Sequence, residues 1–216
     1  MNCYIITAIV HIPRKKQWRI CLFDTGVSIQ IPAEFIVLKS LDIGRKLSEQ
    51  EVEELISEAE RVKGKETAFR LLAVRARSES ELIQRLRREG LKQSSVQRVI
   101  SDLKRLNLIN DEAYAYSFVQ DFLQRRPSGR LRLKAELYKK GIKEAVAKCV
   151  LDMVFAETST IELAQSAAHK WLAKHSKISK KECFSRLGRY LYQQGFNWDV
   201  IEEVIGVDGE FARSEK

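Results

Sequence analysis

The chain has 216 residues, of which 44% are hydrophobic and 31% are charged, and 38 Lys and Arg against 29 Asp and Glu give a formal net charge of +9. This hydrophobic fraction is sufficient for packed cores and excludes a wholly disordered chain. The sequence holds no apolar run of about 18 residues, which argues against a membrane-spanning helix. Without a secretory leader pattern or a Cys-x-x-Cys pair, we expect a cytoplasmic protein with reduced thiols.

The first 40 residues favour β-strands. β-branched and aromatic residues dominate residues 4–12, 18–23 and 27–31, and polar or glycine-containing turns separate these segments. We expect a three-strand meander, which is close to the smallest sheet that is stable and should pack on a neighbouring helix. Residues 1–40 are therefore interpreted as a small N-terminal β domain.

A helical pattern follows the predicted strands. Ser48 and Glu51 form a capping-box sequence, in which each side chain satisfies a free backbone N–H of the other residue. Apolar residues at helical spacing continue to about Lys63, and Gly64 is predicted to end this helix. Residues 41–64 are therefore interpreted as a connecting helix, and we expect only helices from there to residue 206.

A block of about 50 residues recurs three times. Each copy has a leucine four residues before a glycine, and the glycines Gly90, Gly141 and Gly195 lie 51 and 54 residues apart. An apolar residue follows each glycine, and a Val-Ile or Val-Leu pair comes nine and ten residues after it. A fixed period of this size indicates tandem supersecondary units. We assign helical repeats to residues 65–110, 111–158 and 159–216.

Each repeat is predicted to contain three helices, so the fold class is mainly α, with three tandem three-helix bundles after a small β meander. The first helix is amphipathic, and in the first repeat its expected buried residues are Phe69, Leu72, Ala73 and Ala76. The second helix ends at the repeat's glycine, because glycine readily takes the positive φ that stops a helix. Since such a bundle buries little apolar surface alone, neighbouring repeats should pack together.

Motifs for catalysis are missing from the sequence. It contains no Gly-x-x-x-x-Gly-Lys-Ser/Thr, no Gly-x-Gly-x-x-Gly and no Gly-x-Ser-x-Gly, and its three histidines lack metal-ligand spacing. Asp111 and Glu112 lie where a helix is predicted to begin, and we interpret them as favouring the helix dipole rather than as catalytic carboxylates. We therefore expect no enzymatic activity, no catalytic residues, no cofactor and no metal.

The positive charge is concentrated in the first repeat. Residues 65–110 carry 11 Lys and Arg, eight of them Arg, against five Asp and Glu. Positive potential should therefore remain for a nucleic-acid backbone or an acidic protein surface, and these residues do not decide between the two. The candidate contact residues, four of which flank a Pro-Ser-Gly break in the second repeat, are Arg75, Arg77, Arg85, Arg87, Arg88, Arg98, Lys104, Arg105, Arg125, Arg126, Arg130 and Arg132.

Two stretches resemble the RecX family of recombinase regulators. The pattern in the first repeat is Arg75-x-Arg77-Ser78-x-x-x-Leu82-x-x-Arg85-Leu86-x-x-x-Gly90. The second begins Leu108-Ile109-x-Asp111-x-x-Tyr114-Ala115-x-x-Phe118-Val119 and continues as Arg126-Pro127-x-Gly129-x-x-x-Leu133-x-x-Glu136-Leu137-x-x-x-Gly141-Ile142. The resemblance covers about residues 65–155, and the third repeat matches by its periodicity and Gly195.

The resemblance implies three tandem helical repeats in an elongated, curved array that binds the RecA recombinase filament on single-stranded DNA. It also implies inhibition of RecA's ATPase, strand-exchange and co-protease activities, with effects on DNA repair and the SOS response. We expect a monomer whose partners are the RecA filament and single-stranded DNA, with no membrane contact. Two alternatives stay open: a helix-turn-helix-like regulator that binds duplex DNA, and an adaptor that binds only proteins.

Overall fold

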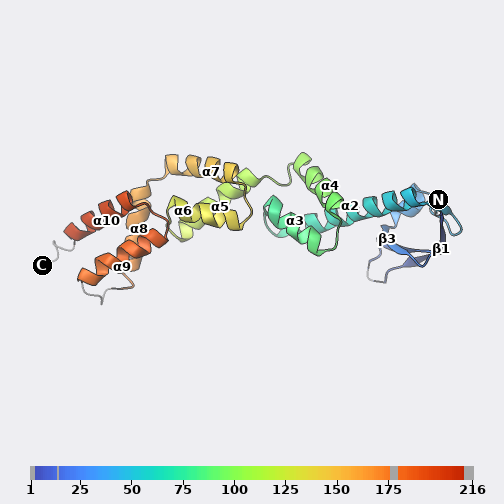
Figure 1. The fold of residues 1–216 in the computed structure, drawn as a ribbon, viewed down its shortest axis with the longest axis horizontal. Coiled ribbons are helices and arrows are strands. Elements are labelled where there is room, and N and C mark those ends of the chain that lie inside the picture. The colour runs from blue at the N-terminus through green and yellow to red at the C-terminus, as the bar shows by residue number, and fades with distance from the viewer. Residues whose placement is uncertain (1–2, 14, 176–179, 212–216) are drawn as a thin grey trace. The chain divides into compact units, whose positions relative to one another are not determined.

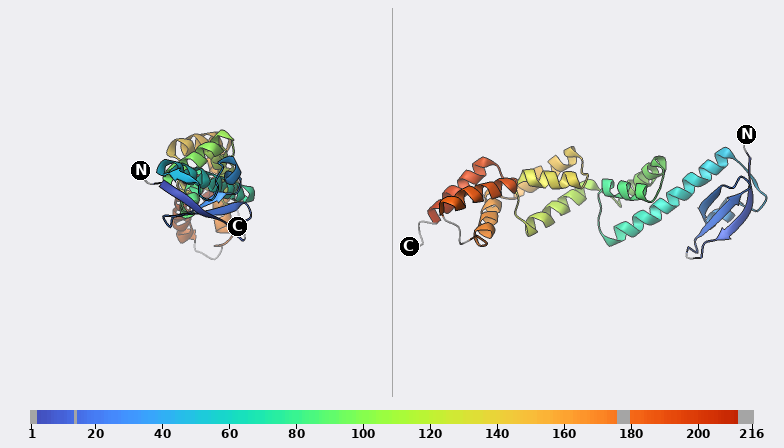
Figure 2. Two further views of the ribbon diagram at one scale, coloured as in Figure 1. Left: turned by 90° about the vertical axis from the view of Figure 1, so that its right-hand side faces the viewer. Right: turned by 60° about the horizontal axis from the view of Figure 1, so that its bottom comes forward.

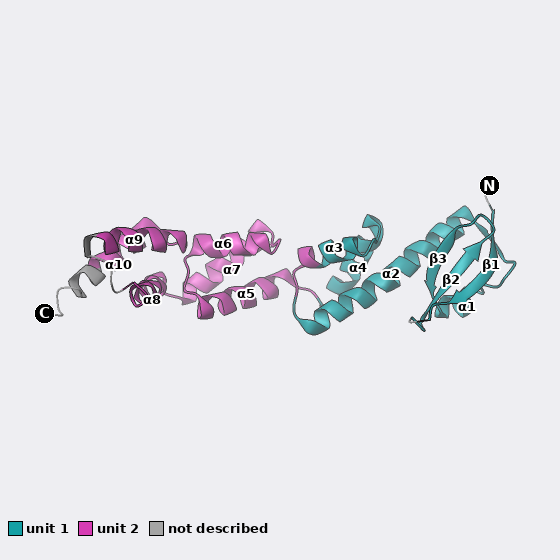
Figure 3. Ribbon diagram, turned by 90° about the horizontal axis from the view of Figure 1, so that it is seen from below, with its two compact units in different colours: residues 1–76, 82–108 teal, residues 77–81, 109–216 magenta. Residues whose placement is uncertain are grey.

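The structure, a computed structural model, describes residues 3–13, 15–175 and 180–211 and is drawn in Figure 1. It separates into two compact units, coloured in Figure 3: residues 1–76 with 82–108 form unit 1, and residues 77–81 with 109–216 form unit 2. Within the described ranges, no helix combines the length and the apolar character that a membrane span requires. The fold is mainly α with strands at the start, as predicted.

Unit 1 begins with a four-stranded antiparallel sheet. Strands β1 (Cys3–His11), β2 (Trp18–Phe23) and β3 (Ser28–Pro32) form the predicted meander, and a short helix, α1 (Glu34–Leu38), follows them. A fourth strand, β4 (Lys46–Ser48), pairs with the free side of β1 and gives the order β3-β2-β1-β4. Strand β4 was not predicted, because three residues carry almost no periodicity and only the pairing with β1 defines them.

Helix α2 (Glu49–Val74) covers the sheet with its first half, and the right-hand view of Figure 2 shows it extending beyond the sheet. The predicted capping box is present: Ser48 Oγ accepts from the Glu51 N–H at 3.2 Å, and Glu51 Oε2 accepts from the Ser48 N–H at 2.7 Å. The core between helix and sheet includes Ile6, Cys21, Ile31, Val52, Leu55 and Ala59. Burial against the helix raises the pKa of the Cys21 thiol to about 11.

The prediction that α2 ends at Gly64 was wrong. Gly64 lies buried inside the continuous helix, where an added Cβ would meet Leu91 Cδ2 and Val99 Cγ2, each at 2.8 Å. The glycine therefore serves close packing between α2 and helix α4 (Gln93–Arg105), and its helix-breaking tendency is overridden by tertiary contacts.

The predicted buried face in the second half of α2 was also wrong. Its buried residues are Gly64, Thr67 and Ala68, whereas Phe69 is 44% exposed. Small side chains make the contact with α4. The prediction relied on the larger apolar residues and therefore placed the buried face on the wrong side of the helix. In the rest of unit 1, α4 and residues 82–88 of helix α3 (Glu79–Arg88) bury a leucine- and valine-rich core that includes Leu82, Leu86, Val96, Val99 and Leu103.

Unit 2 contains two further three-helix groups. Helices α5 (Asp111–Arg125), α6 (Arg130–Lys139) and α7 (Glu144–Glu157) surround one core, and α8 (Thr160–Leu172), α9 (Lys180–Gln193) and α10 (Trp198–Phe211) surround the next. The loops between α4 and α5 and between α7 and α8 support our proposal that the repeats divide at residues 110/111 and 158/159. The predicted buried alanines Ala164, Ala167 and Ala168 of the third repeat are confirmed.

The repeat glycines end their helices as predicted. The φ angles of Gly90, Gly141 and Gly195 are +83°, +73° and +86°. In each repeat the next residue's N–H donates to the carbonyl five residues earlier, at 3.4 Å (Leu91 to Leu86), 3.1 Å (Ile142 to Leu137) and 3.3 Å (Phe196 to Leu191). This bond is the signature of a Schellman C-cap, which requires a left-handed residue at the glycine position.

In unit 2, the glycine turns also serve as docking points, in a pattern that occurs twice. Ser78 Oγ donates to the Lys140 carbonyl at 2.6 Å, and the Gly129 N–H, 51 residues after Ser78, donates to the Gln194 carbonyl at 2.9 Å. Lys140 and Gln194 each directly precede a repeat glycine, so the same two positions of the repeat meet in both contacts. The start of α3 therefore packs on the glycine turn of the second repeat, and the start of α6 packs on the glycine turn of the third repeat.

Candidate nucleic-acid interface

Helix α3 exposes three of the predicted arginines on the side opposite its core. Leu82 and Leu86 are fully buried, whereas Arg85, Arg87 and Arg88 are exposed in the last turn of the helix. Cations at this end of a helix interact favourably with its dipole, so the placement costs no stability. The apolar spacing of the sequence thus sets which way the arginines face.

The contacts of these arginines are those of surface side chains. Arg85 lies 3.6 Å from Glu89, and Arg87 donates two hydrogen bonds to Gln93 Oε1, at 2.9 and 2.6 Å. Arg88 has no ion pair or hydrogen bond within the residues that the structure describes. Exposed pairs contribute little to stability, so these guanidinium groups can be redirected to phosphates at small cost.

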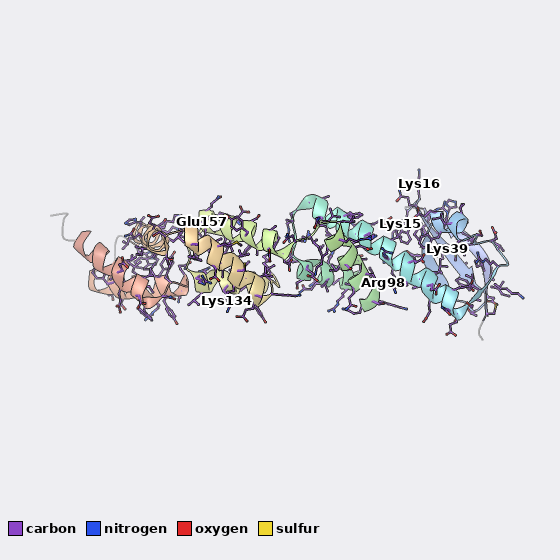
Figure 4. The ribbon with its side chains drawn as sticks, turned by 90° about the horizontal axis from the view of Figure 1, so that it is seen from above. Lys15, Lys16, Lys39, Arg98, Lys134 and Glu157 are labelled. Atoms are coloured by element: carbon purple, nitrogen blue, oxygen red, sulfur yellow. The ribbon has the colours of Figure 1, made fainter. Side chains whose placement is uncertain are left out.

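Four further cations surround or flank Asp102 on α4. The carboxylate contacts Arg61 at 2.6 Å, Lys65 at 2.8 Å and Arg105 at 3.7 Å. Arg98 lies one turn before Asp102 on the same helix, donates to Ser57 Oγ at 3.0 Å, and is labelled in Figure 4. The hydrogen bond from Lys65 and, after it, that from Arg61 hold the pKa of Asp102 below its ordinary value.

Two members of this cluster, Arg61 and Lys65, were not among the predicted contact residues. Arg61 lay in the segment interpreted as a connecting helix, and Lys65 lay directly after its predicted end. Once α2 continues through Gly64, Ser57, Arg61 and Lys65 stand four residues apart on one face of one helix. That spacing was visible in the sequence, but the assumed break hid it.

The remaining predicted residues of the first repeat lie around the helix ends. Arg75 is exposed directly after α2, and its Nη1 donates to the Ala76 carbonyl at 3.0 Å. Arg77, which belongs to unit 2, lies 4.0 Å from Glu81. Lys104 is exposed in the last turn of α4.

The four predicted arginines of the second repeat separate into two pairs. Arg125 and Arg126 are exposed at the end of α5, and Arg125 Nε donates to the Asp121 carbonyl at 3.0 Å. By contrast, Arg130 forms an ion pair with Asp152 on α7, and Arg132 donates to Gln194 Oε1 at 2.7 Å. The second pair therefore already contacts other parts of unit 2.

Asp111 and Glu112 lie in the first turn of α5, as predicted, and Asp111 has a further capping role at another helix. Its Oδ1 accepts a hydrogen bond from the Glu79 N–H at 2.8 Å, at the start of α3. The N-cap of its own helix is Asn110, whose Oδ1 accepts from the N–H groups of Glu112 and Ala113. Asp111 thus satisfies a free N–H of a helix 32 residues earlier in the chain, which local sequence cannot reveal.

These features define a class of protein: tandem three-helix domains whose exposed helix faces carry arginine, a surface suited to polyanions. Three family models match the chain, described as the first, second and third three-helix domains of RecX, at residues 65–103, 110–151 and 157–205. The Regulatory protein RecX of Chlorobaculum tepidum is 32% identical over 69% of this chain and 91% of its own length. The chain belongs to the RecX family.

Further relatives agree over most of the chain. The Regulatory protein RecX of Clostridium perfringens is 27% identical over 84% of this chain and 85% of its own length. A crystal structure of regulatory protein RecX shares the fold with a TM-score of 0.69 at 21% identity, covering 93% of this chain and 98% of that one. The structure of RecX from Lactobacillus salivarius gives a TM-score of 0.62 at 26% identity, over 68% and 95% of the two chains.

Proposed function

We propose that the protein binds the RecA recombinase filament on single-stranded DNA and inhibits RecA's ATPase, strand-exchange and co-protease activities. Through RecA it would affect DNA repair and the SOS response in the cytoplasm. Membership of a family whose curated members are named regulatory protein supports a regulatory role. The observation that carries the contact with DNA is the exposed arginine set of α3, Arg85, Arg87 and Arg88.

The proposed contact is electrostatic. A guanidinium group is planar and pairs with phosphate through two parallel hydrogen bonds, and each phosphate neutralised releases condensed counterions. Of the twelve predicted residues, the exposed ones carry most of this contact in our proposal. Arg130 and Arg132 contribute less, because they contact Asp152 and Gln194 of their own chain.

The proposed inhibition needs only occupancy, because the protein acts as a monomer that binds and turns nothing over. Titrating it into RecA on single-stranded DNA should therefore lower ATP hydrolysis in proportion to bound protein and reach a plateau near stoichiometric amounts. ATP hydrolysis that stays constant at a several-fold excess over RecA would contradict the proposal.

Replacing the α3 arginines tests which residues bind DNA. We expect the R85Q/R87Q/R88Q variant to bind a single-stranded oligonucleotide with a log–log salt slope that is smaller by about 0.7 for each phosphate that the variant no longer neutralises. The measurement is fluorescence anisotropy at several salt concentrations. The control is K134Q/K139Q/K148Q, which removes three lysines of unit 2 that were not predicted contacts. A slope equal to that of the parent would return the α3 arginines to a purely solvent-facing role.

A helix-turn-helix-like regulator of duplex DNA is the alternative function. It is favoured by the connection between α3 and α4, two helices joined by the short turn at Gly90. A sequence-dependent footprint on duplex DNA without RecA would support it. Duplex binding that shows no sequence preference would count against it and in favour of the filament-binding function.

A further inference from the structure

We propose that unit 1 contains a second polyanion-binding site, a cationic groove that holds a phosphodiester strand. The groove has a volume of about 700 Å³ and lies between the turn joining β1 to β2 and the middle of α2. Four cations line it: Lys15, Lys16, Lys63 and Arg70. None of them is among the twelve arginines and lysines assigned to the filament contact, so the proposal goes beyond that function.

The fold brings these cations together from two elements. Lys15 and Lys16 lie in the turn between β1 and β2 and are labelled in Figure 4. Lys63 and Arg70 are seven residues apart on α2, a spacing that places them on one face of a helix. Because α2 continues through Gly64, Lys63 before this glycine and Arg70 after it line the same groove.

Three of the four cations are available, whereas Lys63 Nζ already donates a hydrogen bond to the Glu89 carbonyl at 3.2 Å. Lys15, Lys16 and Arg70 are exposed and make no ion pair within the part of the chain that the structure describes. Glu66 Oε2 accepts a hydrogen bond from Trp18 Nε1 at 3.2 Å, and Glu89 lies 3.6 Å from Arg85. Four cations against two partnered carboxylates leave the groove positive.

The lining favours a phosphate backbone over other ligands of this size. Sites for small apolar ligands are mostly hydrophobic, and peptide grooves add apolar pockets for side chains. Here the tryptophan that lines the groove, Trp18, is only 7% exposed, and the other lining groups are mainly charged side chains, amides and a hydroxyl. Such a surface recognises charge rather than side-chain shape, so its ligand is a nucleic-acid strand bound without sequence preference.

The test is binding of the full chain to a fluorescent oligothymidylate in the absence of RecA. We expect K15Q/K16Q/R70Q to lower the log–log salt slope by about 0.7 for each phosphate left without its cation, or about 2 for all three. The control K39Q/K46Q/K143Q removes three cations outside the groove and should keep the parent slope. Glu66→Gln should raise the affinity, because it deletes a negative charge while its amide oxygen still accepts from Trp18.

The outcomes separate the sources of the anion and the two proposals. Polyglutamate could bind the parent protein and lose its binding in K15Q/K16Q/R70Q, while the salt slope for oligothymidylate stays the same in the variant. This result would mean that the groove takes an acidic peptide, and it would overturn the proposal. Unchanged binding in both K15Q/K16Q/R70Q and E66Q would also overturn it. Neither result depends on RecA. The ATPase titration can therefore contradict the proposed function while the groove is confirmed, and the groove can be overturned while the titration supports the proposed function.

Discussion

Asp102 is the residue around which the cations of the first repeat are arranged. Its side chain is 11% exposed, yet it keeps its charge because Arg61, Lys65 and Arg105 all contact the carboxylate. A buried carboxylate without such partners would be neutralised rather than ionised. The same contact fixes the position of α2 against α4, so one acidic residue links helix packing to the placement of a basic surface.

Asp102→Asn should lower the free energy of unfolding of unit 1 at pH 7 by about 1–3 kcal/mol, because the variant cannot form these charged hydrogen bonds at a buried position. The pKa of Asp102 is lowered in the folded state relative to about 3.9 in unfolded chains. Its contribution is therefore fully present above that unfolded value and is lost as the pH falls through the folded-state pKa. Urea unfolding at pH 7 and in acid should show a flatter pH dependence in the variant.

Glu144→Gln is the matched control for this effect. The hydrogen bond from Lys134 also lowers the pKa of Glu144, but the Glu144 side chain is 78% exposed, so solvent screens the interaction. Its replacement should leave the unfolding curve nearly unchanged. Equal destabilisation in D102N and E144Q would show that burial of Asp102 is not what makes its ion pairs matter.

At the scale of the element, α2 shows how tertiary contacts override a local preference. Glycine in a helix interior is unfavourable by about 1 kcal/mol relative to alanine, and on this ground Gly64 was expected to end the helix. The close approach of Leu91 and Val99 makes the absence of a side chain at this position worth more than the reduced helix propensity. The resulting 26-residue helix serves both the sheet and the first repeat.

Gly64→Ala should therefore destabilise the protein by about 1–3 kcal/mol, the usual cost of overpacking a core, although alanine is the better helix former. Gly206→Ala in α10 is the control, because a Cβ there meets nothing within 4 Å. That variant should be neutral or slightly stabilising. Thermal unfolding followed by circular dichroism measures both, and a stabilised G64A protein would show that α2 and α4 are not packed this closely.

At the scale of the whole molecule, the repeats share one turn but use it differently. A Cβ on Gly90 would meet nothing within 4 Å, whereas one on Gly141 would overlap the Ser80 side chain and one on Gly195 would overlap the Arg132 backbone nitrogen. All three glycines need positive φ, but Gly141 and Gly195 also accept the start of a preceding repeat's second helix. All three repeat glycines thus form the turn that ends a helix, and two of them, Gly141 and Gly195, also contact the preceding repeat.

Alanine substitutions at these glycines should rank accordingly. We expect Gly90→Ala to cost about 1–2 kcal/mol, the penalty for a left-handed backbone outside glycine. Gly141→Ala and Gly195→Ala should cost more, because the docking helix must also move, and Gly195 should be the worst since it meets rigid backbone. Urea unfolding of the three variants checks the order, and equal destabilisation would assign the glycines to turn geometry alone.

The basic surface could be anticipated only in part. Arg87 and Arg88 could be anticipated from Leu82 and Leu86, because a regular helix that buries these leucines turns positions 87 and 88 away from the core, with Arg85 at the edge of the buried face. Arg132 also lies in an arginine-rich segment, but its side chain contacts Gln194, 62 residues later in the chain. Charge counts treat such residues alike, since they hold no information on long-range partners.

Periodicity and glycine chemistry by themselves determined that this chain forms strands followed by three look-alike helical repeats, because both depend on neighbours a few residues away. The tertiary structure alone decided that Gly64 lies inside a helix, that β4 joins the sheet, and that Arg61, Lys65 and Asp102 meet. The physical reason is the same in each case: these features arise from contacts between segments distant in sequence, whose energies exceed the weak local preferences that a sequence displays.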